Sequence, residues 1–191
     1  MASTEPFPIF LRLSGRPVLL VGGGAVAAGK LRALLEAGAR VTIVAPEVRP
    51  ELDQPGVEVL RREFRPDDLA GQWLAIAAAP PHVNRQVAAA AEERRIFVNA
   101  VDDAASASAF LGGIVRKEGV TLAISTAGRA PALAGLLREA LEAVLPAEVG
   151  DWIATAEVLR ARWRAEGIPM PGRRPLLLRA LNELYANRGA P

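Results

Sequence analysis

A glycine-rich turn is the feature of this chain with the most definite chemical meaning. Gly22-x-Gly24-x-x-Ala27 lies between the apolar run 17–21 and a segment rich in Ala and Leu. In this pattern the first glycine permits a tight turn, the second lets a pyrophosphate approach the backbone, and the small third residue lets helix and strand pack closely. Free amides at the helix N-terminus then bind the phosphates. The spacing therefore predicts a dinucleotide site around Gly22, Gly23 and Gly24, with a purely structural turn as the alternative.

A carboxylate follows the second strand that the pattern predicts. Glu47 lies just past Pro46, where an acidic side chain can bind the ribose hydroxyls of a dinucleotide. An ordinary solvated charge is the alternative for Glu47. The strand end itself carries no arginine to bind a 2′-phosphate, which favours NAD over NADP.

Two further carboxylates, Asp102 and Asp103, follow the fifth predicted strand. Open α/β sheets bind their ligands beyond the carboxyl ends of the strands, so these side chains should lie beside the ligand. A carboxylate with a pKa tuned by partial burial can act as a general base there. Helix capping or an ordinary turn is the alternative.

The loop from Ser125 to Pro131 joins a strand to a helix and is rich in hydroxyl groups and small residues. Its hydroxyls and amides could hold substrate carboxylates, or could simply cap the helix that begins near Pro131. His82 is the only histidine. Since no other metal-binding side chain accompanies it, we expect His82 on the surface, just before a helix.

Strands and helices alternate up to residue 103. The predicted strands cover residues 17–21, 40–45, 57–60, 73–79 and 96–101, and the predicted helices cover 25–37 and 83–94. Continuous apolar runs such as 17–21 are typical of strands buried on both faces of a parallel sheet. Successive βαβ units predict a right-handed, doubly wound, Rossmann-like α/β sheet.

A different pattern follows Asp103. Residues 110–116 and 120–125 are strand-like runs separated by Lys117-Glu118-Gly119, which predicts a β-hairpin. Beyond Pro131 the apolar residues recur at helical spacing, which predicts three amphipathic helices. Their apolar positions are Leu133, Leu136, Leu137, Leu141, Val144 and Leu145, then Trp152, Leu159 and Trp163, then Leu177, Leu181 and Leu184. Small helices bury little surface alone, so we expect them to pack on a partner subunit.

Composition excludes several classes of protein. The 191 residues are 51% hydrophobic and 23% charged, which is enough for a core and excludes a disordered chain. The absence of cysteine excludes disulfides, thiolate metal sites and a cysteine nucleophile, and a single histidine argues against a resident metal. A net charge of +2 is too small for electrostatic binding of nucleic acid.

No apolar run reaches the ~18 residues of a membrane span. The N-terminal residues also lack the pattern of a signal peptide, so we expect a cytoplasmic protein that does not bind membranes. All but two of the 23 basic residues are arginine. Genomic base composition explains such a bias, but arginine also suits an acidic small-molecule ligand because its planar fork pairs with carboxylates.

Taken together, these segments resemble the precorrin-2 dehydrogenase family, which also forms the N-terminal module of siroheme synthases. The matching segments are residues 7–10, 15–16, 21–24 with Val26, Ala27 and Lys30, 35–42, 73–78, 98–103 and 123–126 through Pro131 to Leu145. Each segment alone is moderately specific, whereas their order and spacing together are highly specific. The resemblance covers about residues 6–146 and continues more loosely to the end.

The resemblance implies a homodimer built from three parts. These are a Rossmann-like NAD-binding domain over residues 1–103, a hairpin and helix for dimerisation over 104–146, and a helical domain over 147–191. It implies NAD-dependent oxidation of the acidic tetrapyrrole precorrin-2 to sirohydrochlorin. In some members of the family, insertion of Fe²⁺ then gives siroheme.

The resemblance also implies roles for particular residues. Asp102 corresponds to the catalytic aspartate of the family's Asn-x-Val-Asp motif. The expected cofactor contacts are Gly22, Gly23, Gly24, Ala25, Val26, Pro46 and Glu47, and the expected substrate contacts are Asn99, Ser125, Thr126 and Gly128.

The chain departs from the family at residues 79–81 (Ala-Pro-Pro) and 109–112 (Ala-Phe-Leu-Gly), where details of the tetrapyrrole site could differ. Three alternatives remain open. The protein could be a dehydrogenase without chelatase activity, a module that senses NAD without catalysis, or an enzyme acting on another small acid.

Overall fold

The computed structural model describes residues 5–188 and the side chains of residues 5–184. The described chain divides into two compact units. The first contains the residues up to Gly112 together with Ser125–Pro131, and the second contains Gly113–Ile124 and the residues from Ala132 onward. The finer three-part division expected from the sequence stays a prediction.

A parallel sheet of five strands forms the centre of the first unit, as predicted. The strands are β1 (Pro17–Val21), β2 (Arg40–Val44), β3 (Glu58–Leu60), β4 (Leu74–Ala77) and β5 (Phe97–Ala100), in the order β3-β2-β1-β4-β5. All four pairings between neighbours are parallel. The middle strands are buried on both faces, which explains their continuous apolar sequences.

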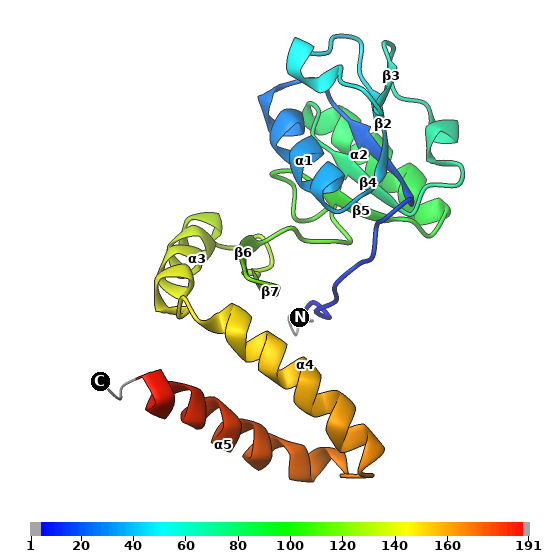
Figure 1. The fold of residues 1–191 in the computed structure, drawn as a ribbon. Helices are drawn as coiled ribbons and strands as arrows, with labels where there is room; N and C mark the ends of the chain where they lie inside the picture. The colour runs from blue at the N-terminus through cyan, green and yellow to red at the C-terminus, as the bar shows by residue number, and fades with distance from the viewer. Residues whose placement is uncertain (1–4, 189–191) are drawn as a thin grey trace. The chain divides into compact units, whose positions relative to one another are not determined.

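Helices cover both faces of this sheet (Figure 1). Helix α1 (Ala25–Glu36) packs Leu31 into a cluster with Leu20 and Ile76, on one face. Helix α2 (Pro81–Glu93) packs Val87 into a cluster with Leu19 on the other. The doubly wound Rossmann-like fold predicted from the sequence is confirmed. Since the chain leaves β1 for β2 on one side and returns to β4 on the other, the carboxyl ends of β1 and β4 border the crevice at which such sheets bind ligands.

Two short 3₁₀ helices, which the sequence pattern does not predict, complete the first unit. They are η1 (Pro50–Leu52) after β2 and η2 (Pro66–Leu69) after β3. Each buries one leucine, Leu52 beside α1 and Leu69 beside α2. The connection from β3 to β4 therefore crosses the sheet with a single 3₁₀ turn instead of a helix.

The predicted strand 110–116 is wrong at its beginning, because the strand starts at Gly113. The residues before it follow the outer edge of β5 instead. Ser108 and Ala109 both donate their amides to the carbonyl of Val98 at 2.9 Å, and the Val98 amide donates to the Ser108 hydroxyl at 2.9 Å. This segment therefore provides hydrogen-bond partners for the backbone of β5 at the edge of the sheet, where backbone groups would otherwise be exposed.

The second unit contains the predicted hairpin and three helices. The elements are β6 (Gly113–Lys117) and β7 (Val120–Ile124), which pair antiparallel, followed by α3 (Pro131–Val144), α4 (Val149–Ala165) and α5 (Met170–Arg188). Lys117 connects the hairpin to the end of α3, since its ammonium donates to the carbonyl of Leu145 at 2.7 Å. None of the helices within residues 5–188 combines the length and the apolar character needed to cross a bilayer.

Candidate functional site: two adjoining cavities

The larger cavity of the first unit lies at the carboxyl ends of β1 and β2 and has a volume of about 670 Å³. We call it the glycine cavity. Its lining residues are Val21, Gly22, Gly23, Gly24, Val44, Ala45, Pro46, Glu47, Glu63, Phe64, Ala78, Ala79, Pro80, His82, Val83 and Gln86. Five of the seven expected cofactor residues, those at 22–24 and 46–47, thus lie around one space.

The three glycines of the turn each have a different surrounding. Gly22 has φ +130°, and a Cβ there would collide with the carbonyl of Ala78. A Cβ on Gly23 would collide with the carbonyl of Glu47, whereas a Cβ on Gly24 would meet no heavy atom within 4 Å. The first two glycines therefore let three strand ends approach closely, and the third leaves open space at the N-terminus of α1. This arrangement suits a diphosphate, which binds free amides at a helix N-terminus.

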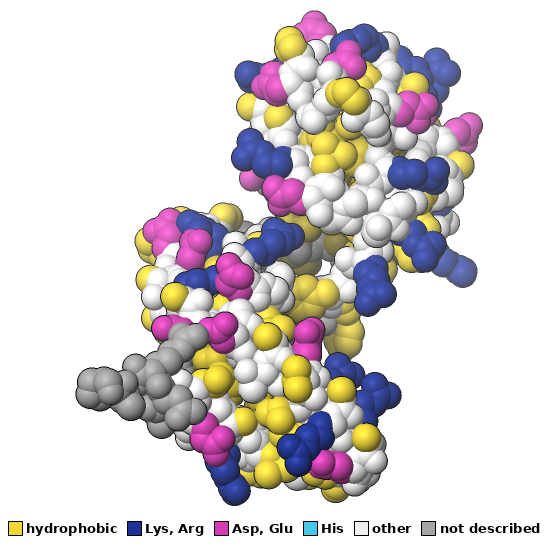
Figure 2. All heavy atoms as spheres, viewed as in Figure 1, with side chains coloured by type: hydrophobic (Ala, Val, Ile, Leu, Met, Phe, Trp, Pro, Cys, Tyr) yellow, Lys and Arg dark blue, Asp and Glu magenta, His cyan; other side chains and the backbone are white. Residues whose placement is uncertain are grey.

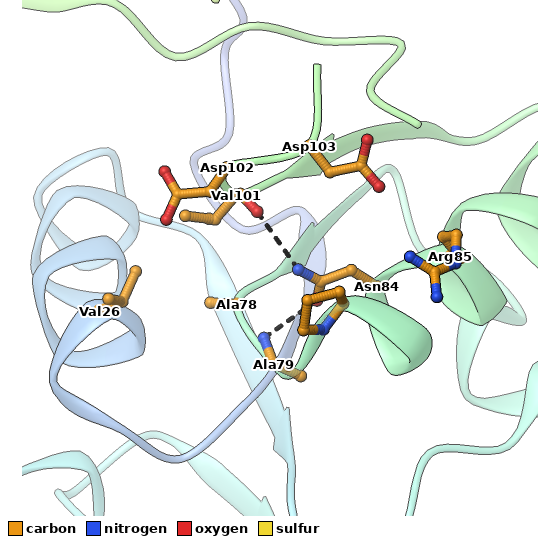
Figure 3. Close-up of a pocket in the computed structure, with 9 residues that line it drawn as sticks. Val26, Ala78, Ala79, Asn84, Arg85, Val101, Asp102 and Asp103 are labelled. Atoms are coloured by element: carbon orange, nitrogen blue, oxygen red, sulfur yellow. Dashed lines mark hydrogen bonds between the residues drawn. The ribbon is translucent and has the colours of Figure 1, made fainter. Parts of the chain in front are cut away.

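A second cavity of about 410 Å³ adjoins the first, and we call it the acid cavity. It is lined by Val26, Ala78, Ala79, Pro81, Asn84, Arg85, Val101, Asp102 and Asp103 (Figure 3). Ala78 and Ala79 line both cavities, so the two spaces meet at the end of β4.

The two adjacent aspartates of this cavity point in different directions. In Figure 3 the carboxylate of Asp102 extends to the side where Val26 of α1 lies, whereas that of Asp103 extends to the side of Arg85. Asp102 is exposed and has φ +58°, a left-handed backbone conformation that aspartate adopts more readily than most residues other than glycine. Its side chain is therefore free to meet a ligand.

Asp103 already has partners within the chain. Its carboxylate accepts hydrogen bonds from the Ser106 hydroxyl at 2.7 Å and from the Ser106 amide at 3.2 Å. The bond from the Ser106 hydroxyl is the main reason that the pKa of Asp103 lies below its ordinary value, with smaller contributions from backbone amides and the charge of Arg85. Asp103 therefore remains ionised and holds the turn after β5.

Asn84 is a residue of this cavity that the sequence pattern does not predict. It is 3% exposed, and its side chain accepts a hydrogen bond from the amide of Ala79 at 3.0 Å and donates one to the carbonyl of Val101 at 3.3 Å. It therefore connects the end of β4 to the residue before Asp102. No periodicity or motif in the sequence distinguishes this asparagine from other polar residues of α2.

His82 is exposed, as expected, although it lies within α2 and not before it. It lines the glycine cavity. Ala25 begins α1 and is exposed, but it lines neither cavity. Among residues 5–188, no three His, Asp or Glu side chains come together in a way that could hold a metal ion.

The expected substrate residues line neither cavity. Asn99 is 7% exposed, and its amide donates to the carbonyl of Ala109 at 2.9 Å, so it fixes the segment beside β5. Ser125 and Thr126 accept hydrogen bonds from the amides of Ala127 and Ala130 within their own loop. Gly128 has φ +74°, and a Cβ there would lie 2.8 Å from the Cβ of Ala104. The loop 125–131 thus lies close to the turn that carries Asp102, and its substrate role stays a prediction.

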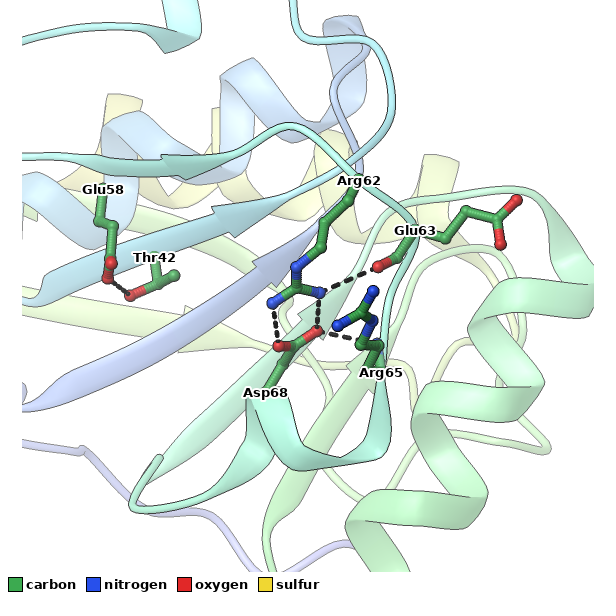
Figure 4. A network of polar contacts seen from close by, with 6 residues as sticks. All are labelled: Thr42, Glu58, Arg62, Glu63, Arg65 and Asp68. Atoms are coloured by element: carbon green, nitrogen blue, oxygen red, sulfur yellow. Dashed lines mark hydrogen bonds and ion pairs between the residues drawn. The ribbon is translucent and has the colours of Figure 1, made fainter.

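An ion pair supports the wall of the glycine cavity formed by Glu63 and Phe64 (Figure 4). Arg62 donates from both terminal nitrogens to Asp68 of η2, at 2.6 and 2.8 Å, and also to the carbonyl of Glu63 at 3.0 Å. The amide of Arg65 donates to the same carboxylate at 2.8 Å. Burial raises the pKa of Asp68, but the hydrogen bonds and charges of Arg62 and Arg65 outweigh this effect and hold it below its ordinary value.

These cavities lie within a segment that matches a known family. The model of an NAD(P)-binding family, NAD_binding_7, matches residues 9–113. The chain belongs to this NAD(P)-binding family. A nicotinamide dinucleotide cofactor, predicted from the glycine turn, is thereby confirmed, and the NAD(P)-binding segment contains all residues that line the two cavities.

Individual relatives of this NAD(P)-binding chain are siroheme synthases. It is 47% identical over 172 residues to siroheme synthase 3 of Aeromonas hydrophila, covering 87% of this chain and 37% of that protein. It is 44% identical over 184 residues to the siroheme synthase of Photorhabdus laumondii, covering 94% of this chain and 39% of that protein. The resemblance seen in the sequence is confirmed, although the chain spans well under half the length of these curated relatives.

A solved structure has the same fold. The structure described as SirC, precorrin-2 dehydrogenase, superposes with a TM-score of 0.68 over 91% of this chain and 88% of that one. At 23% sequence identity this likeness concerns the fold.

Proposed function

We propose that the protein catalyses the NAD-dependent dehydrogenation of precorrin-2 to sirohydrochlorin in siroheme biosynthesis. The observation that carries the proposal is the junction of the glycine cavity and the acid cavity at Ala78 and Ala79. This junction gives a dinucleotide access to a carboxylate, Asp102, that has no hydrogen-bond partner in the structure's described residues and faces the α1 side of the cavity. The similarity to siroheme synthases supplies the substrate class.

Bound NAD supplies the hydride acceptor. The chain's own residues then have three tasks. The turn at Gly22–Gly24 and the N-terminus of α1 bind the diphosphate, Val26 restricts the space beside Asp102, and Asp102 accepts the proton that the macrocycle loses as its hydride leaves. A positioned carboxylate in such a role contributes ~10²–10⁴-fold to rate.

NAD is proposed over NADP because the glycine cavity has an acidic rim. Glu47 and Glu63 both line it and both are exposed, so either would repel a 2′-phosphate and could instead accept a hydrogen bond from a ribose hydroxyl. The nearby guanidinium of Arg62 is already bound to Asp68 and to the carbonyl of Glu63. Three hydrogen bonds therefore already hold this guanidinium to groups of the chain itself.

The substrate is an acidic tetrapyrrole, and we propose that the loop 125–131 holds its carboxylates. Ser125 and Thr126 use their hydroxyl oxygens to accept amide hydrogens, which leaves each O–H available as a donor. Gly128 brings this loop to Ala104, near Asp102. Asn99 would act indirectly, because its side chain is engaged with Ala109.

Insertion of Fe²⁺ into sirohydrochlorin is proposed as a second activity of the same cavity. It requires a base for the pyrrole protons, and exposed Asp102 can supply one. Comparison of the rate of siroheme formation with and without enzyme, from sirohydrochlorin and Fe²⁺, tests this part. A rate no greater than the uncatalysed one would exclude the chelatase activity and leave only the proposed dehydrogenase activity.

A homodimer is also proposed, from the apolar face predicted for the first C-terminal helix. On α3, Leu133, Leu136, Leu137, Leu141 and Val144 are all exposed. Hydrophobic side chains also appear at the surface over the helices of the second unit in Figure 2. Contiguous apolar faces of this kind mark protein interfaces. Leu136→Glu should give a monomer in light scattering, whereas a monomeric wild-type protein would refute the dimer.

The deciding experiment is incubation of the purified protein with precorrin-2 and NAD while NADH absorbance is followed. Stoichiometric NADH and sirohydrochlorin are expected. A protein that binds NAD without forming NADH would instead be a sensing module. NADH formed only with another acid would place the protein in a different reaction.

A further inference from the structure

The buried carboxamide of Asn84 has no role in the chemistry described above. We propose that Asn84 is a positioning residue, which replaces a backbone hydrogen bond between β4 and β5 and so directs Asp102 into the acid cavity. The catalytic part of this inference rests on the proposed function. The structural part does not.

The hydrogen-bond ladder between β4 and β5 shows what Asn84 replaces. Ala77 and Ala100 are partners in the parallel register, and the Val101 amide donates to the carbonyl of Ala77 at 2.9 Å. In a parallel ladder the next bond would join the Ala79 amide to the carbonyl of Val101, because each strand bonds at alternate residues. This bond would place Asp102 in a continued strand.

The side chain of Asn84 occupies that place instead. Its Oδ1 accepts from the Ala79 amide at 3.0 Å, and its Nδ2 donates to the Val101 carbonyl at 3.3 Å. Figure 3 shows the carboxamide between the two strand ends, with one hydrogen bond to each. Both backbone groups therefore keep a partner although the strands no longer pair directly.

Separation of the strands has two consequences at the site. Ala78, Ala79, Val101 and Asp102, two residues from each strand end, all line the acid cavity. Asp102 also leaves the extended conformation of β5 and takes φ +58°. A direct bond between Ala79 and Val101 would close the strands together, so the amide both opens the cavity and fixes the turn that carries the acid.

Asparagine is the residue that these two bonds require. An amide both donates and accepts, whereas a carboxylate of the same shape only accepts. Asn84→Asp would keep the bond from Ala79 but set a carboxylate oxygen against the Val101 carbonyl. Asn84→Ala would remove both bonds and the separating group.

The kinetic test uses Asn84→Asp, Asp102→Asn and the double variant in the precorrin-2 assay. Asn84→Asp should lower kcat by about 10–100-fold with the KM for NAD changed by less than about threefold, since orientation and not binding is lost. In the Asp102→Asn background, Asn84→Asp should lower kcat no further, because the effects of two residues are not additive when one acts through the other. Ala89→Asp, on the exposed face of α2, adds the same charge and should leave kcat unchanged.

Two kinetic results would overturn the proposal: an unchanged kcat in Asn84→Asp, or an equal further loss in the Asp102→Asn background. Crystal structures of the wild type, Asn84→Asp and Asn84→Ala give a readout independent of activity. Asp102 should lose its positive φ in at least the alanine variant, and retention of the wild-type turn in both variants would refute the positioning role. If the wild type forms no NADH, the proposed function fails, and the structures still decide whether Asn84 positions Asp102.

Discussion

The α-carbon of Gly23 lies directly against the backbone carbonyl of Glu47, with no room for a Cβ between them. The carbonyl of Gly23 in turn accepts a hydrogen bond from the amide of Arg49 at 3.0 Å. The turn after β1 and the loop after β2 are therefore in direct contact and are held together by a backbone hydrogen bond. Since both line the glycine cavity, the groups proposed for the diphosphate and the ribose are held in a fixed relation.

Alanine substitutions in the turn should separate steric effects on the protein from effects on the ligand. Gly23→Ala should destabilise the protein by about 1–3 kcal/mol and raise the Kd for NAD, because the methyl group collides with backbone that cannot rotate away. Gly24→Ala should lower the free energy of unfolding by no more than about 1 kcal/mol, the cost of alanine at the N-cap of α1, but should still raise the Kd for NAD, because its methyl group enters the open space at the N-terminus of that helix. Calorimetric titration and thermal unfolding measure both quantities.

Gly29→Ala is the matched control, since Gly29 lies within α1 and a Cβ there meets nothing within 4 Å. This change should stabilise the protein by about 0.5–1 kcal/mol through helix propensity and leave NAD affinity unchanged. Equal NAD affinity in the wild type and the Gly24→Ala variant would contradict a diphosphate site at the turn.

Cofactor preference should depend on the two glutamates of the glycine cavity. The variant with both Glu47→Gln and Glu63→Gln should use NADP better relative to NAD by about tenfold, equal to ~1.4 kcal/mol, because the repulsion of a 2′-phosphate is removed. The ratio of kcat/KM for the two cofactors measures this. Glu51→Gln is the control, since Glu51 pairs with Arg49 outside the cavity. An unchanged ratio in the double variant would show that neither carboxylate faces the ribose.

The Arg62–Asp68 pair should contribute a pH-dependent stability. The pKa of Asp68 is lower in the folded protein than its ordinary value of about 3.9. The ionised carboxylate therefore contributes fully to the free energy of unfolding above about pH 3.9, and this contribution is lost as the pH falls from there through the lower pKa of the folded protein. Asp68→Asn should therefore cost about 1–2 kcal/mol at neutral pH, and this difference from wild type should shrink below about pH 4. Urea unfolding over a series of pH values measures the difference.

Asp53→Asn provides the comparison for this prediction. Asp53 also pairs with an arginine, Arg61 at 2.7 Å, but both side chains are about half exposed. Exposed pairs contribute about 0–1 kcal/mol, so this variant should differ little from wild type. A difference between Asp68→Asn and wild type that persists undiminished at low pH would show that packing, and not charge, accounts for the effect.

The sequence predicted the elements whose signals are local. Buried strands such as β1 and β4 have continuous apolar residues, and the glycine turn has a fixed spacing. Gly24, Glu47 and Asp102 each follow a strand of the parallel sheet. Their location at the same edge of the sheet could therefore be predicted from the order of the strands alone.

Features that depend on three-dimensional register could not be read in this way. The role of Asn84 depends on which backbone groups of β4 and β5 face each other, and no periodicity reveals that. The beginning of β6 is not predictable for a similar reason, because the residues before it, Ser108 and Ala109, donate their amides to the carbonyl of Val98 in another strand. Arg62 precedes η2 and Asp68 lies within it, six residues later, and this spacing carries no structural signal in the sequence.

The turnover of Asp102→Asn, compared with that of Asp103→Asn, tests the central claim most directly. The two carboxylates are adjacent in the chain, but only Asp102 points to the α1 side of the acid cavity, while Asp103 is bonded to Ser106. Asp102→Asn should lower kcat for NADH formation from precorrin-2 by about 10²–10⁴-fold with NAD affinity preserved, whereas Asp103→Asn should cost about tenfold at most. Full turnover in Asp102→Asn, or a larger loss in Asp103→Asn, would contradict the account.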